Sequence, residues 1–209
     1  MATFPDSPQD VRLDPRNLKG LAHPLRVKLL GALREGGPAT ASMLAARLGE
    51  SSGATSYHLR QLEGFGFVAE DAARGSRRER WWRAVHRSTH FDEGALAREP
   101  GTALLGAEYL RAVAGQCSAG MLRWIDALPS APEDWARSGD MSDWALRLTP
   151  DQARELSAEL EAVVRRYRPF DPEEPEVEGA SLVAVQIQVL PRLREAGRAS
   201  CRERVLTDV

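Results

Sequence analysis

Hydrophobic positions recur at helical spacing early in the chain. After a leader rich in proline and aspartate, the segment PLRVKLLGALREGG places leucines on one helical face between Pro24 and a Gly-Gly-Pro stop. It predicts a short amphipathic helix. Thr40 can cap a second helix, whose apolar residues lie in MLAARL and which Gly49 can end.

A third helix follows the second after only a few residues. Ser51 or Ser52 can cap it, and Leu59 and Leu62 would point inward before the chain is broken by glycine at position 64. Two helices joined by so short a turn predict a helix-turn-helix motif.

The next segment, FVAEDAARGSRRERWWRAV, has apolar ends around a polar centre at Gly75 and Ser76. Such a pattern predicts a β-hairpin with a basic tip. Three helices followed by a hairpin in fewer than 75 residues is the order of a winged helix-turn-helix.

The second half of the chain changes to alanine, leucine and acidic residues. An apolar stripe at helical spacing runs from Thr102 to Leu128, and a second amphipathic helix is expected at about residues 150–167. The run SLVAVQIQVLP alternates as a strand does, with WALRL as its expected partner. The long stripe has no evident partner, which favours a dimer.

The expected fold class is therefore α+β. The sequence predicts a flexible leader (1–14), a winged helix-turn-helix domain with a three-helix core and a hairpin wing (15–90), a mainly helical dimerisation or effector region with a small β element (91–192), and a tail without stable structure (193–209).

Charge divides the chain in the same place. Residues 15–87 contain 13 basic and 6 acidic residues, a net charge of +7, and the remainder carries −9, which together give the overall −2. A basic segment joined to an acidic one suggests that the first meets a polyanion. Chance segregation of charge on solvated surfaces is the alternative explanation.

Neither a membrane segment nor an export signal is evident, so the chain is expected in the cytoplasm without membrane association. Its two cysteines, Cys117 and Cys201, are too far apart in sequence to suggest a disulfide framework. Sequence motifs of hydrolases and nucleotide-binding enzymes are missing, so we expect no enzymatic activity and no cofactor.

The motifs HPLR, SYHLRQL and GFV, in this order, resemble the ArsR-type winged-helix transcriptional repressors over about residues 17–87. Metal-sensing members carry a cysteine motif in the helix that begins near Thr40, and ATASMLAARLG contains none. The chain is thus similar to a metal-independent subgroup, and no metal ligands are expected.

The resemblance implies that the third helix enters the major groove of DNA. It implies that six residues face DNA, namely Ser52, Gly53, Thr55, Ser56, Tyr57 and Arg60. It also implies that four wing arginines approach phosphates or the minor groove, namely Arg74, Arg77, Arg78 and Arg80. Ser51 and Ser52 are candidates on physical grounds as well, because small polar residues at a helix start let the backbone lie close to phosphates.

Plainer explanations exist for several candidate residues. The two serines can cap the helix without touching DNA, and Tyr57 and Arg60 can be ordinary surface residues. His86 and His90 have the spacing of two zinc ligands on one helical face, but a third ligand is missing, so we expect no site. Trp124, Trp135 and Trp144 can line an effector pocket, although core or dimer contacts are commoner roles.

These observations predict a DNA-binding transcriptional regulator, a repressor that binds an inverted-repeat operator in double-stranded DNA as a homodimer. One alternative is a sensor of the same fold that responds to an unidentified small-molecule effector. Another is a winged-helix dimerisation module without DNA binding, as in some small-molecule methyltransferases, but no cofactor-domain fingerprint accompanies it here.

Overall fold

The computed structural model describes residues 10–74, 79–91, 100–167, 170–175 and 177–192. They fall into two units, residues 1–144 with 168–184, and residues 145–167 with 185–209. The predicted boundary between residues 90 and 91 therefore lies inside the first unit. Within the described residues, no helix is both long and apolar enough to span a bilayer.

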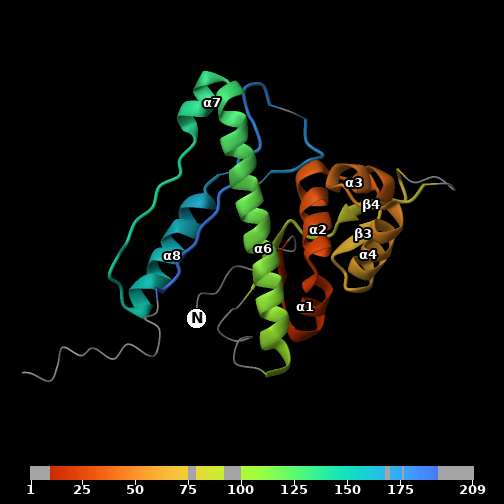
Figure 1. The fold of residues 1–209 in the computed structure, drawn as a ribbon, viewed down its shortest axis with the longest axis horizontal. Helices are drawn as coiled ribbons and strands as arrows, with labels where there is room; N and C mark the ends of the chain where they lie inside the picture. The colour runs from red at the N-terminus through yellow and green to blue at the C-terminus, as the bar shows by residue number, and fades with distance from the viewer. Residues whose placement is uncertain (1–9, 75–78, 92–99, 168–169, 176, 193–209) are drawn as a thin grey trace, which may run out of the picture. The chain divides into compact units, whose positions relative to one another are not determined.

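Four helices form the N-terminal half of the first unit (Figure 1). They are α1 (Pro15–Leu21), α2 (Pro24–Gly36), α3 (Ala41–Leu48) and α4 (Ser52–Gly64). Thr40 caps α3 by accepting a hydrogen bond from the Met43 amide, and Gly49 ends it in the left-handed conformation at φ +68°. The prediction of α2, α3 and α4 is confirmed. α1 was missed, although Asp14 before Pro15 is a helix-start signal.

The wing is a small antiparallel sheet. Strand β4 (Trp81–Ala84) lies between β2 (Ala39–Thr40) and β3 (Val68–Glu70). In register, Trp82 of β4 lies opposite Ala39 on one side and Glu70 on the other. The predicted hairpin is confirmed in the part that the structure describes, and its tip at residues 75–78 lies outside that part.

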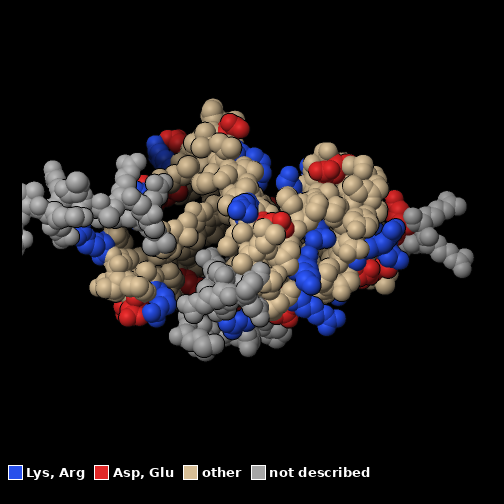
Figure 2. All heavy atoms as spheres, turned by 60° about the horizontal axis from the view of Figure 1, so that its bottom comes forward, with Lys and Arg blue, Asp and Glu red and all other residues tan. Residues whose placement is uncertain are grey.

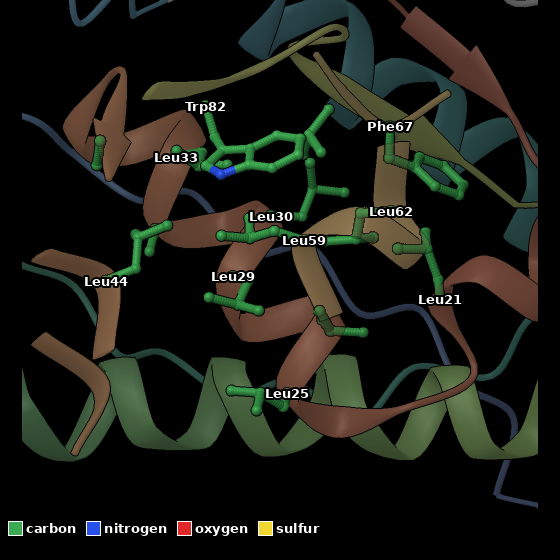
Figure 3. Packing of buried hydrophobic residues seen from close by; sticks show 14 of the residues in the cluster. Leu21, Leu25, Leu29, Leu30, Leu33, Leu44, Leu59, Leu62, Phe67 and Trp82 are labelled. Carbon is green, nitrogen blue, oxygen red and sulfur yellow. The ribbon is translucent and has the colours of Figure 1, made fainter. Parts of the chain in front are cut away.

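Leucines from all four helices meet in one hydrophobic core. Leu59 and Leu62 of α4 have no exposed surface, and they pack with side chains of α2 and with Phe67 (Figure 3). Trp82 of the wing sheet closes the same cluster. Each fully buried leucine or phenylalanine contributes about 1.5–3 kcal/mol, so this cluster is the main source of the domain's stability.

The predicted apolar stripe lies on the long helix α6 (Pro100–Ala127), and its two halves have different surroundings. Its N-terminal half packs against α1 and α2, with Tyr109 buried in the core and Val113 packed against it (Figure 1). The expectation that the whole stripe lacks a partner is therefore wrong. From about Met121 onward the aliphatic side chains are exposed, including Leu122 and Ile125, while Trp124 is partly buried. A 3₁₀ turn η1 (Leu128–Ser130) and the short helix α7 (Glu133–Ser138) follow.

Residues 10–14 of the predicted flexible leader are ordered. Strand β1 (Asp10–Arg12) pairs in parallel with β5 (Ser88–His90), and Leu13 is buried. Arg34 of α2 holds β5 in place by donating hydrogen bonds to the His86 carbonyl at 2.8 Å and to the Ser88 carbonyl at 3.2 Å. Burial lowers the pKa of Arg34 to about 10, so it remains charged at neutral pH.

The second unit contains α8 (Pro150–Val164). Thr149 and Gln152 form a capping box at its start, which confirms the predicted helix. The predicted strand pair is wrong, because neither residues 144–148 nor residues 181–191 form a strand. No described residue of this unit is buried, so its apolar side chains form no core of their own within the unit.

We expect Gly20→Ala to destabilise the first unit. A Cβ at Gly20 would lie 2.7 Å from ring atoms of both Phe65 and Phe67, and packed rings cannot move aside cheaply. The free energy of unfolding, measured by urea denaturation, should fall by about 1–3 kcal/mol. Gly115→Ala in α6 is the control, because its Cβ would meet nothing within 4 Å. It should raise stability by about 0.5–1 kcal/mol. Equal effects of the two substitutions would contradict this packing.

Candidate nucleic-acid interface

Core packing determines which face of α4 is exposed. Thr55, Leu59 and Leu62 lie four and three positions apart and have no exposed surface. The expectation that Thr55 faces DNA is therefore wrong for its side chain, because Thr55 belongs to the inward face. The opposite face carries Tyr57 and Arg60, and the Tyr57 side chain is 56% exposed.

The first turn of α4 is open to solvent. Ser51 caps it, with its Oγ accepting a hydrogen bond from the Ala54 amide at 3.2 Å, so Ser51 rather than Ser52 is the cap. Ser52 and Gly53 follow on the exposed surface, and no atom lies within 4 Å of a Cβ built at Gly53. A large ligand can thus approach the backbone at this end of α4, where the helix dipole favours a negatively charged group.

A polar cleft of about 350 Å³ lies between the helix-turn-helix and the wing. Ser56 and Arg60 of α4 line it together with Arg80 and Trp82 of the wing. The rest of its lining consists of Thr40, Ala41 and Ser42 around the start of α3 and of Glu79. Sequence reasoning missed Ser42 as a candidate residue, although its position two residues after the Thr40 cap places it in the first turn of α3.

The wing arginines already have partners in the free chain. Arg80 pairs with Glu70 at 3.1 Å, and its guanidinium lies 5.4 Å from the centre of the Trp82 ring. Arg74 pairs with Asp71 at 3.3 Å and with Glu173 at 2.7 Å. The remaining predicted wing residues, Arg77 and Arg78, lie outside the described residues.

The acidic segment at residues 171–174, which follows α8 in the sequence, lies against the base of the wing. Besides the Glu173–Arg74 pair, Asp171 accepts a hydrogen bond from Arg87, and Pro172 packs over Gly37. The structure thus places two carboxylates of this segment on basic residues of the winged-helix domain.

Basic and acidic side chains are interspersed on the surface shown in Figure 2. Lysines and arginines form several separate patches on this face. Local geometry must therefore select which of these cations could meet a ligand.

Two histidines connect α2 to α4. The rings of His23 and His58 lie 4.3 Å apart, and Nδ1 of His23 caps α2 by accepting a hydrogen bond from the Leu25 amide at 3.1 Å. Burial and the nearby Arg26 lower the pKa of His23. Burial, followed by the charges of His23 and Arg26, lowers the pKa of His58. Both rings are therefore neutral at neutral pH.

The other candidate sites do not come together. His86 and His90 lie in a loop and a strand, so the one-helix geometry assumed for a zinc site is wrong. Among the described residues, no three histidine, cysteine, aspartate or glutamate side chains are grouped as a metal site would require. Trp124 packs against Gly139, and Trp144 is 73% exposed. A role of these tryptophans in effector binding stays a prediction.

A family model described as a helix-turn-helix domain matches residues 21–71. The match spans α2, α3, α4 and β3, which is less than half of the chain. No curated protein matches the sequence. The chain thus contains a helix-turn-helix DNA-binding domain of the ArsR or winged-helix type.

The histidine pair predicts a loss of stability in mild acid. The pKa values of His23 and His58 are lower in the folded chain than the 6.5 of a free histidine, so the folded state favours the neutral rings. Their contribution is complete above about pH 6.5 and is lost as the pH falls through the folded pKa values. Denaturant titrations between pH 7.5 and pH 5 measure this loss.

The control for this prediction is the variant His23→Asn/His58→Gln, in which asparagine can still cap α2. Its free energy of unfolding should fall less steeply with acidification than that of the native chain. His86, whose pKa is also lowered by burial, would account for part of the remaining slope. Identical slopes in the two proteins would contradict the assignment.

Proposed function

We propose that the chain is a transcriptional repressor that binds an inverted-repeat operator in double-stranded DNA as a homodimer. The observation that carries this proposal is the exposed face of α4, with Ser52, Tyr57 and Arg60 outward, beside the polar cleft of the wing. A face of this kind on the second helix of a helix-turn-helix is suited to the major groove, because its N-terminal residues can reach base edges.

Tyr57 is the best candidate for reading bases. It lies on the outer surface of α4, one turn after the open N-terminal end, and most of its side chain is accessible. Ser52 and Gly53 are small, so they allow the backbone at the start of α4 to come close to the DNA. An exposed aromatic residue one turn after small residues can enter a groove without steric conflict on that side.

The cleft is suited to a backbone phosphate. Arg60 and Arg80 supply positive charge from two sides, and the first turn of α3 supplies backbone amides and the Ser42 hydroxyl. Glu79 would oppose an anion and keeps the cleft from binding one strongly. A phosphate bound here would hold α4 at a fixed depth in the groove, so we assign Arg60 to positioning and Tyr57 to sequence preference.

The acidic segment would compete with DNA for Arg74. Both side chains of the Arg74–Glu173 pair are about half exposed, and a pair of this kind contributes little stability. A DNA phosphate, which carries a full negative charge, can therefore replace Glu173 on the arginine at small cost.

The proposal is tested by selecting bound sequences from a random pool of duplex DNA. Enrichment of an inverted repeat with half-site centres about 10 base pairs apart is expected for a two-fold dimer. Placed between a promoter and a reporter gene, the selected site should lower expression when the chain is present. No enrichment would reject DNA recognition, and enrichment of single half-sites would reject the dimeric mode.

Two variants distinguish the proposed base recognition by Tyr57 from the proposed positioning by Arg60 on the selected site. Tyr57→Ala should weaken binding to that site by about 1–3 kcal/mol and leave binding to random DNA unchanged. Arg60→Ala should weaken both to a similar degree and reduce the slope of log K against log salt by about 0.9. Fluorescence anisotropy at several salt concentrations measures both.

Arg111→Ala is the charge-matched control for Arg60→Ala, because Arg111 is an exposed residue of α6 outside the cleft. It should leave DNA affinity nearly unchanged. A change of sequence preference in Arg60→Ala, combined with uniform weakening in Tyr57→Ala, would reverse the assigned roles.

Glu173→Gln should strengthen DNA binding by up to about fivefold at low salt, since it removes one of the two carboxylates that pair with Arg74 and leaves only Asp71. The gain should be absent when Arg74 is also replaced by alanine. Glu155→Gln in α8 removes the same charge elsewhere and serves as the control. If the two glutamine variants bind DNA equally well, general charge rather than release of Arg74 explains the effect.

A further inference from the structure

An apolar segment near the C-terminus forms no strand with any other part of the chain that the structure describes. Residues 180–190 read ASLVAVQIQVL and contain no charged side chain. They belong to neither of the two sheets in the part of the chain that the structure describes. Val183 and Val185 are 59% and 60% exposed, and Ile187 and Leu190 are exposed as well. An apolar segment of this length is not stable in water by itself and is an edge to which another strand can add.

The ends of this segment are placed symmetrically. Gly179, which adopts a positive φ of 77°, and Pro191 both interrupt extended pairing, and each is six positions from Val185. One step further out, Glu178 and Arg192 are each seven positions from Val185 and carry opposite charges. The two halves of the segment have the same length and carry opposite charges at their ends. Two copies that run antiparallel can therefore pair along their whole length, with unlike charges facing each other at both ends.

We propose that residues 180–190 pair antiparallel with the same segment of a second copy, with Val185 on the two-fold axis. This inference rests on the homodimer of the proposed function and names one of its contacts. In this register Val183 of each copy lies opposite Ile187 of the other copy. The valines and isoleucine at odd positions then share one face of the two-stranded ribbon.

Backbone chemistry agrees with this register. Residues along an antiparallel pair alternate between hydrogen-bonded and non-hydrogen-bonded positions. Val185 and Pro191 are six residues apart, an even number, so both occupy the same kind of position. Pro191 has no N–H to donate and fits the non-hydrogen-bonded class. The two Val185 residues then lie at a close position, with Cα atoms about 4.5 Å apart.

Charge complementarity supports the same alignment. Glu178 of each copy lies opposite Arg192 of the second copy, so one ion pair forms at each end of the ribbon. A parallel arrangement would place each charge beside its like. A shift of register would move the charges apart and would place apolar residues opposite the glycine and proline ends.

Disulfide trapping in the full chain tests the register. In a background with Cys117→Ala and Cys201→Ser, Val185→Cys provides a single thiol on the two-fold axis, within the Cα range that a disulfide spans. Val183→Cys is the matched control, because Val183 is as exposed as Val185 but would lie about 14 Å from its own copy. Under mild oxidation, Val185→Cys should form a linked dimer at least about tenfold faster than Val183→Cys alone.

A mixture of Val183→Cys and Ile187→Cys chains should also become linked, because these positions face each other in the proposed register. Equal linking rates for Val183→Cys and Val185→Cys, or no linking of Val185→Cys, would overturn the proposal. Thermal unfolding of each reduced variant verifies that it is folded before its linking rate is compared.

Charge exchange gives an independent measurement. Glu178→Arg should weaken the dimer in sedimentation equilibrium, and the double variant Glu178→Arg/Arg192→Glu should restore the native dissociation constant. If the double variant is weaker than the single one, the two charges do not face each other and the register is wrong.

Failure of this inference can be told apart from failure of the proposed function. A native chain that is dimeric and binds an inverted repeat, but whose Val185→Cys variant does not link, has its interface elsewhere, for example on the exposed half of α6 or between residues 181–190 and 144–148. A native chain that is monomeric on the selected DNA refutes both the ribbon and the dimer. DNA recognition itself is then judged from Tyr57→Ala.

Discussion

The burial of Leu59 and Leu62 orients α4, and the rest of the candidate interface depends on it. Both side chains are fully buried in the core cluster that α4 shares with α1, α2, α3 and Phe67, so any rotation of α4 about its axis would expose them. Thr55 is carried inward with them, and Tyr57 and Arg60 are carried outward. The cleft depends on the same packing, because α3 and the wing sheet meet α4 across that core. Apolar packing thus determines which polar groups are presented to a ligand.

The polar groups are held much less firmly than the core. Arg80 is paired with Glu70, and Arg74 with Asp71 and Glu173, all through partly exposed side chains. Such pairs are weak in water and are screened by salt. They keep the arginines near the surface in defined positions and still allow exchange of one anion for another. A rigid scaffold with exchangeable charges is well suited to a ligand whose phosphates repeat along a groove.

The sequence predicted the elements whose signals are local. Pro24, Thr40 and Gly49 mark helix ends, and the structure places the ends of α2 and α3 there. Thr55 was misjudged because it was assigned to the DNA-facing set from the family resemblance, although a helical period places it on the same face as Leu59. The failure at residues 181–191 has a different cause. Alternation shows that a segment can be a strand, but a strand exists only with a partner, and one chain's local pattern does not contain that partner.

The pairing of β1 with β5 brings the two ends of the winged-helix domain side by side. Asp10 and Ser88 are opposite each other in register although 78 residues separate them, and Arg34 ties the second strand to the interior helix α2. Domains whose ends lie close together tolerate altered chain connectivity, and two parallel neighbouring strands can be joined by a crossover linker of about a dozen residues. A circular permutant that joins residue 90 to residue 10 in this way would keep the contacts among α1, α2, α3 and α4, while α6 and its contacts with α1 and α2 lie outside the permuted segment. The order of the helices along the chain is, in this domain, separable from their packing.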